Sequence, residues 1–120
     1  MIIIDTSILM ELGKVDVFGQ LKDFKEYGEP AVLTSCLEEL ARLGTKKAIF
    51  ARHMVEKTAE FDPKLKIIKS YEKNADKAML KLARPEKDAV ATNDKKLIKE
   101  LKLNNVKVIR LRQKKYLEYA

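Results

Sequence analysis

Two aspartates each follow a short apolar run, one near the start of the sequence and one near its end. Asp5 comes directly after the run 1–4, and Asp94 comes shortly after the run 89–92. Each run is typical of a buried strand, and ligands bind outside the carboxyl ends of the strands in an open parallel sheet. We therefore expect the two carboxylates to share a pocket. Carboxylate oxygens suit hard divalent cations, so the pattern favours metal-assisted hydrolysis.

Three further acids are candidates for the same pocket because each lies near the expected start of a helix. They are Glu38, Glu39 and Asp76. Helix N-termini favour negative charge, so position alone leaves open whether these acids bind a ligand or only stabilise the helix dipole. Ser35 and Glu38 have the spacing of a capping box, which would turn Glu38 back toward Ser35. Asp76 lies beside the apolar side of its helix, as expected for a pocket wall.

Asp88 is excluded from the pocket by its position in the chain. It begins the strand that Asp94 follows, six residues later. At ~3.3 Å per residue, an extended chain separates the two carboxylates by roughly 20 Å. We expect Asp88 to be a loop residue or the first residue of the strand.

Strand-like and helical patterns alternate along the whole chain. Strands are expected at 1–4, 31–34, 65–68, 89–92 and 106–111, and helices at 7–12, 16–28, 36–43, 45–61, 72–83 and 95–102. This alternation predicts a single α/β domain over residues 1–120, with three layers and a mostly parallel sheet of about five strands. The ending, 113–120, is expected to be a frayed or helical tail.

The charge balance indicates an anionic partner. Lys and Arg number 25 against 18 Asp and Glu, which gives a formal net charge of +7. Nucleic acid is the expected partner, and a lysine-rich surface kept for solubility is the alternative. Lys73, Lys77, Lys81 and Arg84 recur at helical spacing, where like charges repel unless a phosphate lies among them.

Other classes of protein are disfavoured by composition. No apolar stretch approaches the ~20 residues of a membrane-spanning helix, so we expect a cytoplasmic protein with no membrane contact. Cys36 is the only cysteine, which excludes an intramolecular disulfide and a thiolate metal cluster. A response-regulator-like phosphotransfer domain is disfavoured, because no second Asp stands two residues after Asp5 and no Gly-rich phosphate loop occurs.

Four short motifs follow one another along the chain, each at an expected strand end or on an expected helix. They are Ile4-Asp5-Thr6-Ser7, Glu39-Leu40-Ala41-Arg42-Leu43, Asn74-Ala75-Asp76-Lys77 and Val90-Ala91-Thr92-Asn93-Asp94-Lys95-Lys96-Leu97. In these motifs the chain resembles the PIN domain ribonucleases over essentially its whole length. The resemblance implies that three or four acids hold one or two Mg²⁺ or Mn²⁺ ions on a parallel sheet and that the protein cuts single-stranded RNA.

Motif matching extends the resemblance to individual residues. The metal-binding and catalytic role falls to Asp5, Glu39, Asp76 and Asp94. Glu39 is preferred to Glu38 because it directly precedes the pattern Leu40-x-x-Leu43. Hydroxyl and amide side chains that would support the ligands are Thr6, Ser7, Thr92 and Asn93. Basic side chains that would hold the RNA are Arg42, Lys46, Lys47, Lys73, Lys77 and Lys95.

The resemblance leaves the biological role open among three alternatives. The segments 90–97 and 106–112 favour a nuclease of ribosomal RNA processing or quality control. A toxin ribonuclease of a VapBC-type toxin-antitoxin pair, partnered by an antitoxin protein, is the second alternative. A non-catalytic RNA-binding PIN scaffold is the third. The apolar residues of the helix expected at 45–61 could also form a homodimer interface.

Overall fold

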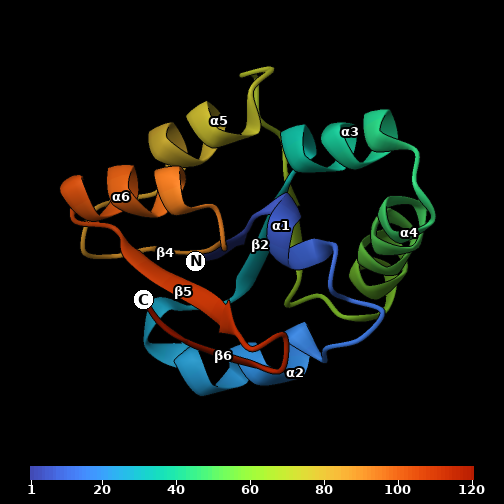
Figure 1. Cartoon of the computed structure of the whole chain (residues 1–120), viewed down its shortest axis with the longest axis horizontal. Coiled ribbons are helices and arrows are strands. Elements are labelled where there is room, and N and C mark those ends of the chain that lie inside the picture. The colour runs from blue at the N-terminus through green and yellow to red at the C-terminus, as the bar shows by residue number, and fades with distance from the viewer.

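The computed structural model describes all residues from Met1 to Ala120 and contains one six-stranded sheet with helices packed against it (Figure 1). The strands are β1 (Ile2–Ile4), β2 (Pro30–Leu33), β3 (Lys66–Ile68), β4 (Ala89–Ala91), β5 (Lys107–Arg112) and β6 (Tyr116–Tyr119). The helices are α1 (Thr6–Leu9), α2 (Val17–Leu21), α3 (Thr34–Leu43), α4 (Lys46–Phe61), α5 (Ala75–Leu82) and α6 (Lys95–Leu103), with a 3-10 helix at Lys22–Tyr27.

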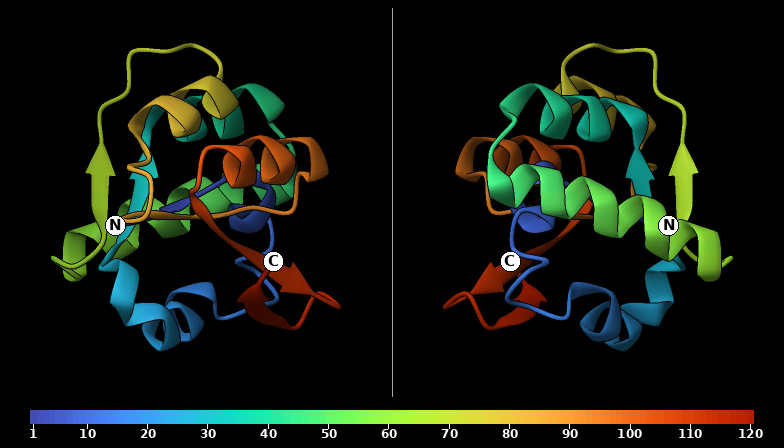
Figure 2. Two further views of the ribbon diagram at one scale, coloured as in Figure 1. Left: turned by 90° about the vertical axis from the view of Figure 1, so that its left-hand side faces the viewer. Right: turned by 90° about the vertical axis from the view of Figure 1, so that its right-hand side faces the viewer.

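The strand order is β3-β2-β1-β4-β5-β6, and the first five strands are parallel. The chain moves outward from β1 to β3, then returns past β1 to β4 and β5. Because such crossovers are right-handed, the reversal places the helices on opposite faces of the sheet. Figure 2 shows α3 and α4 on one side and α5 and α6 on the other. The expected α/β class and mostly parallel sheet are confirmed, and β1 and β4 meet where the order reverses.

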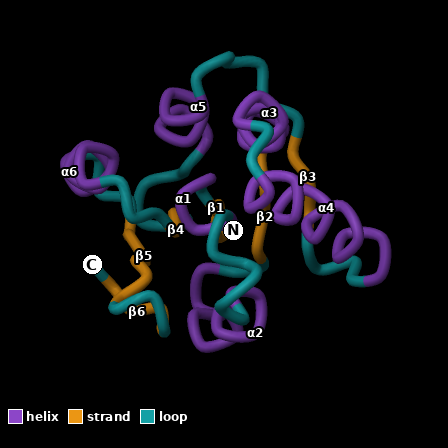
Figure 3. Tube along the Cα trace, turned by 45° about the vertical axis from the view of Figure 1, so that its right-hand side comes forward, coloured by secondary structure: helices purple, strands orange, loops and turns teal.

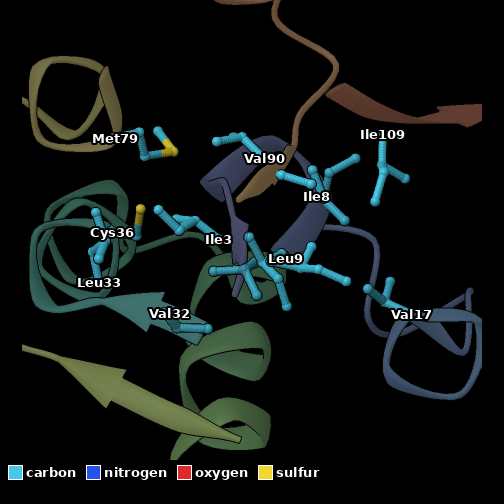
Figure 4. Packing of buried hydrophobic residues seen from close by; sticks show 14 of the residues in the cluster. Ile3, Ile8, Leu9, Val17, Val32, Leu33, Cys36, Met79, Val90 and Ile109 are labelled. Atoms are coloured by element: carbon cyan, nitrogen blue, oxygen red, sulfur yellow. The ribbon is translucent and has the colours of Figure 1, made fainter. Parts of the chain in front are cut away.

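The central strands are apolar throughout because both of their faces are covered. Every residue of β1 and β4 is buried, as parallel strands between two helical layers require. Figure 4 shows Ile3 of β1 flanked by Val32 of β2 and Val90 of β4, next to Met79 of α5 and Cys36 of α3. Burying a large apolar side chain contributes about 1.5–3 kcal/mol. This core gives the strand ends a rigid base.

The predicted capping box at the start of α3 is wrong. The helix begins at Thr34, directly after β2, and its N-cap residue Leu33 has no polar side chain. The Ser35 hydroxyl instead contacts the side chain of Ser70 and donates to the backbone oxygen of Glu72 at 2.6 Å. A contact with residues more than 30 positions away therefore replaces the local cap.

The segment expected to form one helix over 16–28 is divided in two. Asp16 caps α2 as expected, since its carboxylate accepts a hydrogen bond from the Gly19 backbone N–H at 3.1 Å. The α-helix then ends at Leu21, and a 3-10 helix follows in which Phe24 has non-helical dihedral angles of φ −116° and ψ 34°. Phe24 is buried, so packing of this side chain accompanies the break.

The C-terminal segment forms a strand, which contradicts the expected frayed or helical tail. β6 pairs antiparallel with β5, and the connecting turn holds Gln113 and Lys114 in left-handed conformations with φ 54° and 53°. Glycine or asparagine usually occupies such positions, so the sequence gives no hairpin signal here. Figure 3 shows the resulting hairpin beside α2. No helix in the structure combines the length and the apolar character that crossing a bilayer requires.

Gln20 fixes the hairpin to α2, and its loss should release β6. The Gln20 side chain donates to the Lys115 backbone oxygen at 2.9 Å and accepts from the Leu117 N–H at 2.7 Å. Gln20→Ala is expected to lower the free energy of unfolding by about 1–2 kcal/mol, because two hydrogen bonds are lost. Urea titration measures the loss, and amide hydrogen exchange should accelerate in β6. Equal exchange in the variant and in a Glu60→Ala control, which changes an exposed acid on α4, would contradict this role.

Candidate active site

Asp5 lies at the carboxyl end of β1, where its side chain is held in one orientation. The residue is 5% exposed. Its backbone N–H donates to Ala91 of the neighbouring strand β4, and its backbone oxygen accepts from the first turn of α1. The hydroxyls of Thr92 and Ser7 both donate to the side-chain oxygen Oδ2, at 2.7 and 2.8 Å. Both donors reach the same oxygen, and the other oxygen, Oδ1, accepts no hydrogen bond from the protein.

The same two hydroxyls connect Asp5 to the turn that begins α6. Ser7 Oγ accepts from the Asn93 backbone N–H at 3.0 Å, and Thr92 Oγ1 accepts from the Asp94 N–H at 3.1 Å. Each hydroxyl therefore donates to the carboxylate and accepts from the turn. This arrangement requires β1 and β4 to be adjacent, so the strand order positions Asp5 relative to Asp94.

The other two expected supporting residues act differently. Asn93 exchanges two hydrogen bonds with the backbone of Leu111, at 2.8 and 3.2 Å, and so fixes the end of β5 beside the turn. Thr6 is buried, and its hydroxyl oxygen has no hydrogen-bond partner. Asn93 thus supports the site through its side-chain contacts with Leu111, whereas the buried Thr6 side chain lies near the Cys36 thiol.

Asp94 serves as the N-cap of α6. Its Oδ1 accepts from the backbone N–H groups of Lys96 and Leu97, at 2.9 and 3.2 Å. The residue is exposed. An N-cap carboxylate satisfies backbone donors that the first helical turn leaves free. One oxygen of Asp94 therefore has a structural role, and Oδ2 makes no hydrogen bond to the protein.

Glu39 on α3 and Asp76 in the first turn of α5 are half-buried. The pKa of Asp76 is raised above its ordinary value, first by burial and then by the negative charges of Asp5, Asp94, Glu39 and Glu100. Asp5, Glu39 and Asp94 therefore lie close enough to Asp76 for their charges to act on it.

A family model described as a PIN-like domain matches residues 2–114. The chain belongs to the PIN-like domain family. Among solved structures, the PIN domain endonuclease Utp24 is similar, with a TM-score of 0.77 and 20% sequence identity over 98% of this chain and 89% of that chain. At 20% identity the similarity shows that the two chains share a fold. A search of curated protein sequences found no match.

The oxygen atoms of this PIN-like domain suit a hard divalent ion, although they are not gathered into a coordination sphere. No three acidic, histidine or cysteine side chains converge closely enough to hold a metal ion in this structure. The candidate donors are the carboxylates of Asp5, Glu39, Asp76 and Asp94. Burial raises the pKa of the Cys36 thiol to about 12, so this side chain is a neutral thiol in the protein. The donor chemistry therefore fits Mg²⁺ or Mn²⁺.

Glu100 is an acid near the site that the sequence did not single out. It lies on α6 and is half-buried, and its charge contributes to the raised pKa of Asp76. Its neighbours Leu97 and Leu101 are buried and define the inner face of the helix. The apolar spacing of α6 places Glu100 at the edge of this inner face, which is the signal that could have identified it.

The basic residues expected to hold RNA are all exposed, and none forms an ion pair. This set consists of Arg42, Lys46, Lys47, Lys73, Lys77 and Lys95. The row of four cations at helical spacing shares Lys73 and Lys77 with this set, but its other two members are neutralised within the protein. Lys81 pairs with Glu72 at 3.3 Å, and Arg84 pairs with Asp88 at 3.0 Å. A phosphate partner is therefore not needed to explain Lys81 and Arg84.

Removing the Thr92 hydroxyl should weaken metal binding although every carboxylate of the site is retained. Thr92→Val keeps the shape of a fully buried side chain and deletes the donor to Asp5 Oδ2. Residues that orient metal ligands typically contribute about 10- to 100-fold to metal affinity or activity. We expect the Mn²⁺ concentration needed for half-maximal cleavage to rise by a factor of this size. Thr45→Val, which removes a cap on α4, is the matched control, and equal loss in both variants would contradict the assignment.

Proposed function

We propose that this PIN-like domain is a divalent-metal-dependent ribonuclease that hydrolyses phosphodiester bonds of single-stranded RNA. The observation that carries the proposal is the placement of Asp5. It lies at the end of β1, fixed by Thr92 and Ser7, and its charge, with those of Glu39 and Asp94, acts on Asp76. The similar solved structure is that of a PIN domain endonuclease, which supports the same function.

In the proposed active site, Asp5, Glu39, Asp76 and Asp94 would hold Mg²⁺ or Mn²⁺. A bound ion would lower the pKa of an attacking water and stabilise charge on the scissile phosphate. The protein orients the ligands: Thr92 and Ser7 occupy Oδ2 of Asp5, so Oδ1 is free for a ligand. Asp94 is similarly held by α6 through Oδ1, which leaves Oδ2 free.

The electrostatic cost of the acidic region favours the presence of a cation. Two carboxylates ~5 Å apart repel by ~3 kcal/mol at an effective dielectric constant of ~20. The raised pKa of Asp76 fits such repulsion: burial is its largest cause, and the charges of Asp5, Asp94, Glu39 and Glu100 add to it. A divalent ion would offset the repulsion directly. RNA would be held nearby through phosphate contacts with the exposed, unpaired cations.

The test is cleavage of a labelled single-stranded RNA by the purified protein. We expect fragments in Mn²⁺ or Mg²⁺ and none in EDTA, together with a higher melting temperature when Mn²⁺ is added. Double-stranded RNA of the same sequence serves as the substrate control. RNA binding without cleavage in either metal would leave only the non-catalytic RNA-binding scaffold.

For the biological role we propose processing or quality control of ribosomal RNA. The proposal follows from the segments 90–97 and 106–112, which resemble that branch of the family. The toxin alternative predicts that expression of this chain alone stops cell growth and that an antitoxin protein restores it. Normal growth during expression of active protein would favour the processing role.

A further inference from the structure

Tyr71 stands out because its side chain has almost no contact with the protein. It is 86% exposed, the largest value among the exposed large apolar side chains. It lies in the segment 69–74, which arches from the end of β3 to the start of α5 (Figure 2). An aromatic ring exposed to water gains no stabilisation from the hydrophobic effect, so packing within this domain does not account for a tyrosine at this position.

Both neighbours of Tyr71 are fixed to the start of α3. The Ser70 N–H donates to Thr34 Oγ1 at 3.0 Å, and the Ser70 hydroxyl accepts from the Ser35 N–H at 3.0 Å. On the other side, the Glu72 backbone oxygen accepts from the Ser35 hydroxyl at 2.6 Å. The backbone of Tyr71 is therefore held on both sides while its ring extends into solvent. Such a ring can bind a ligand with little further loss of backbone entropy.

The charges around the ring are positive. The Lys69 ammonium lies 5.5 Å from the centroid of the Tyr71 ring, and Lys73 is exposed two residues beyond it. The one acid of the segment, Glu72, is paired with Lys81 of α5 at 3.3 Å. An exposed aromatic ring on a fixed backbone, with free cations beside it, combines a stacking surface for a base with contacts for its phosphates.

The segment ends at the proposed active site. Asn74 caps α5 by accepting from the Lys77 N–H at 3.1 Å, and Asp76 lies in the first turn of that helix. We propose that Tyr71 stacks on an unpaired base of the single-stranded RNA and so guides the strand toward the carboxylates. This inference rests on the proposed function, because it assigns a binding residue to the same substrate. The lysines distinguish an RNA strand from an apolar protein surface as the occupant.

The test measures binding of a short single-stranded RNA by fluorescence anisotropy in EDTA, where cleavage is absent. Base–aromatic stacking implies that Tyr71→Ala weakens binding about 5- to 150-fold. Tyr71→Phe, which keeps the ring, should bind like the parent protein. Phe61→Ala is the matched control, since Phe61 is 77% exposed at the end of α4. Melting curves of all variants should coincide with that of the parent protein, because none of the changed side chains is buried.

A second arm uses an abasic strand of the same length, which keeps the phosphates. The parent protein should lose affinity when bases are removed, and Tyr71→Ala should lose correspondingly less. The salt dependence of Tyr71→Ala should stay unchanged, because that slope reports phosphate contacts. If the parent protein binds and cleaves RNA and Tyr71→Ala binds equally well, the stacking role is wrong and the nuclease remains. If the parent protein does not bind RNA, both proposals fail.

Discussion

Asp5→Asn is expected to lower metal-dependent RNA cleavage on the order of 10²- to 10³-fold, the size of effect seen when one charge-stabilising group is removed from an active site. The substitution keeps the shape of the side chain and replaces a charged oxygen ligand with an amide. Thr92 and Ser7 can still donate to the remaining oxygen, so the end of β1 should keep its position. The loss should therefore appear in catalysis and not in folding.

Two measurements separate lost catalysis from lost folding in this variant. The melting temperature without metal should be close to that of the parent protein, and the stabilisation by Mn²⁺ should largely disappear. Glu38→Gln is the control, because Glu38 is the exposed neighbour of Glu39 on α3 and should cleave normally. Parent-like cleavage by Asp5→Asn, or a loss in Glu38→Gln as large as that in Glu39→Gln, would contradict the proposed set of acids.

Asp88→Ala is expected to lower the free energy of unfolding by about 3 kcal/mol, because it removes a buried carboxylate that accepts four hydrogen bonds. Asp88 directly precedes β4 and is fully buried. Its carboxylate accepts from the Met1 amino group at 2.7 Å, from the Arg84 N–H at 2.8 Å and from the Arg84 guanidinium at 3.0 Å. The interaction ties the loop before β4 to the start of β1. Urea titration measures the loss.

The pH dependence of stability gives a second readout of Asp88. Burial raises the pKa of Asp88, but hydrogen bonds from Arg84 and the Met1 amino group outweigh it and hold the pKa well below its ordinary value. Asp88 therefore stabilises the fold fully above its unfolded pKa of about 3.9, and this contribution is lost as the pH falls further. Stability of the parent protein should drop steeply in acid, and Asp88→Ala should flatten that drop.

The control for this prediction is a surface acid whose pKa is also lowered by neighbouring arginines. Hydrogen bonds from Arg110 and Arg112 lower the pKa of Glu118 on β6. Glu118→Gln should change stability little, because exposed ion pairs contribute little. An equal decrease in the free energy of unfolding in Asp88→Ala and Glu118→Gln would show that the buried Asp88 contributes no more than a surface acid. Folded Asp88→Ala protein should keep its RNA cleavage, since Asp88 lies at the opposite end of β4 from Asp94.

Features that depend on residues close together in the chain could be predicted from the sequence. The apolar runs marked the five parallel strands, and Asp16 was recognised as a helix cap. The motifs identified the PIN-like domain, which the family model confirms. Two strand-end aspartates predicted a shared edge, because parallel strands present their carboxyl ends together. The fold does connect Asp5 to the turn at Asp94, through Thr92 and Ser7.

Contacts between residues far apart in the chain could be seen only in the tertiary structure. Ser35 has the local spacing of a capping box, yet it bonds to the segment after β3, because that loop supplies partners from more than 30 residues away. The segment after Gln113 becomes a strand because β5 offers a free edge and Gln20 binds its backbone. Local patterns report interactions within a few residues, whereas strand pairing and buried polar contacts depend on the packing of the whole chain.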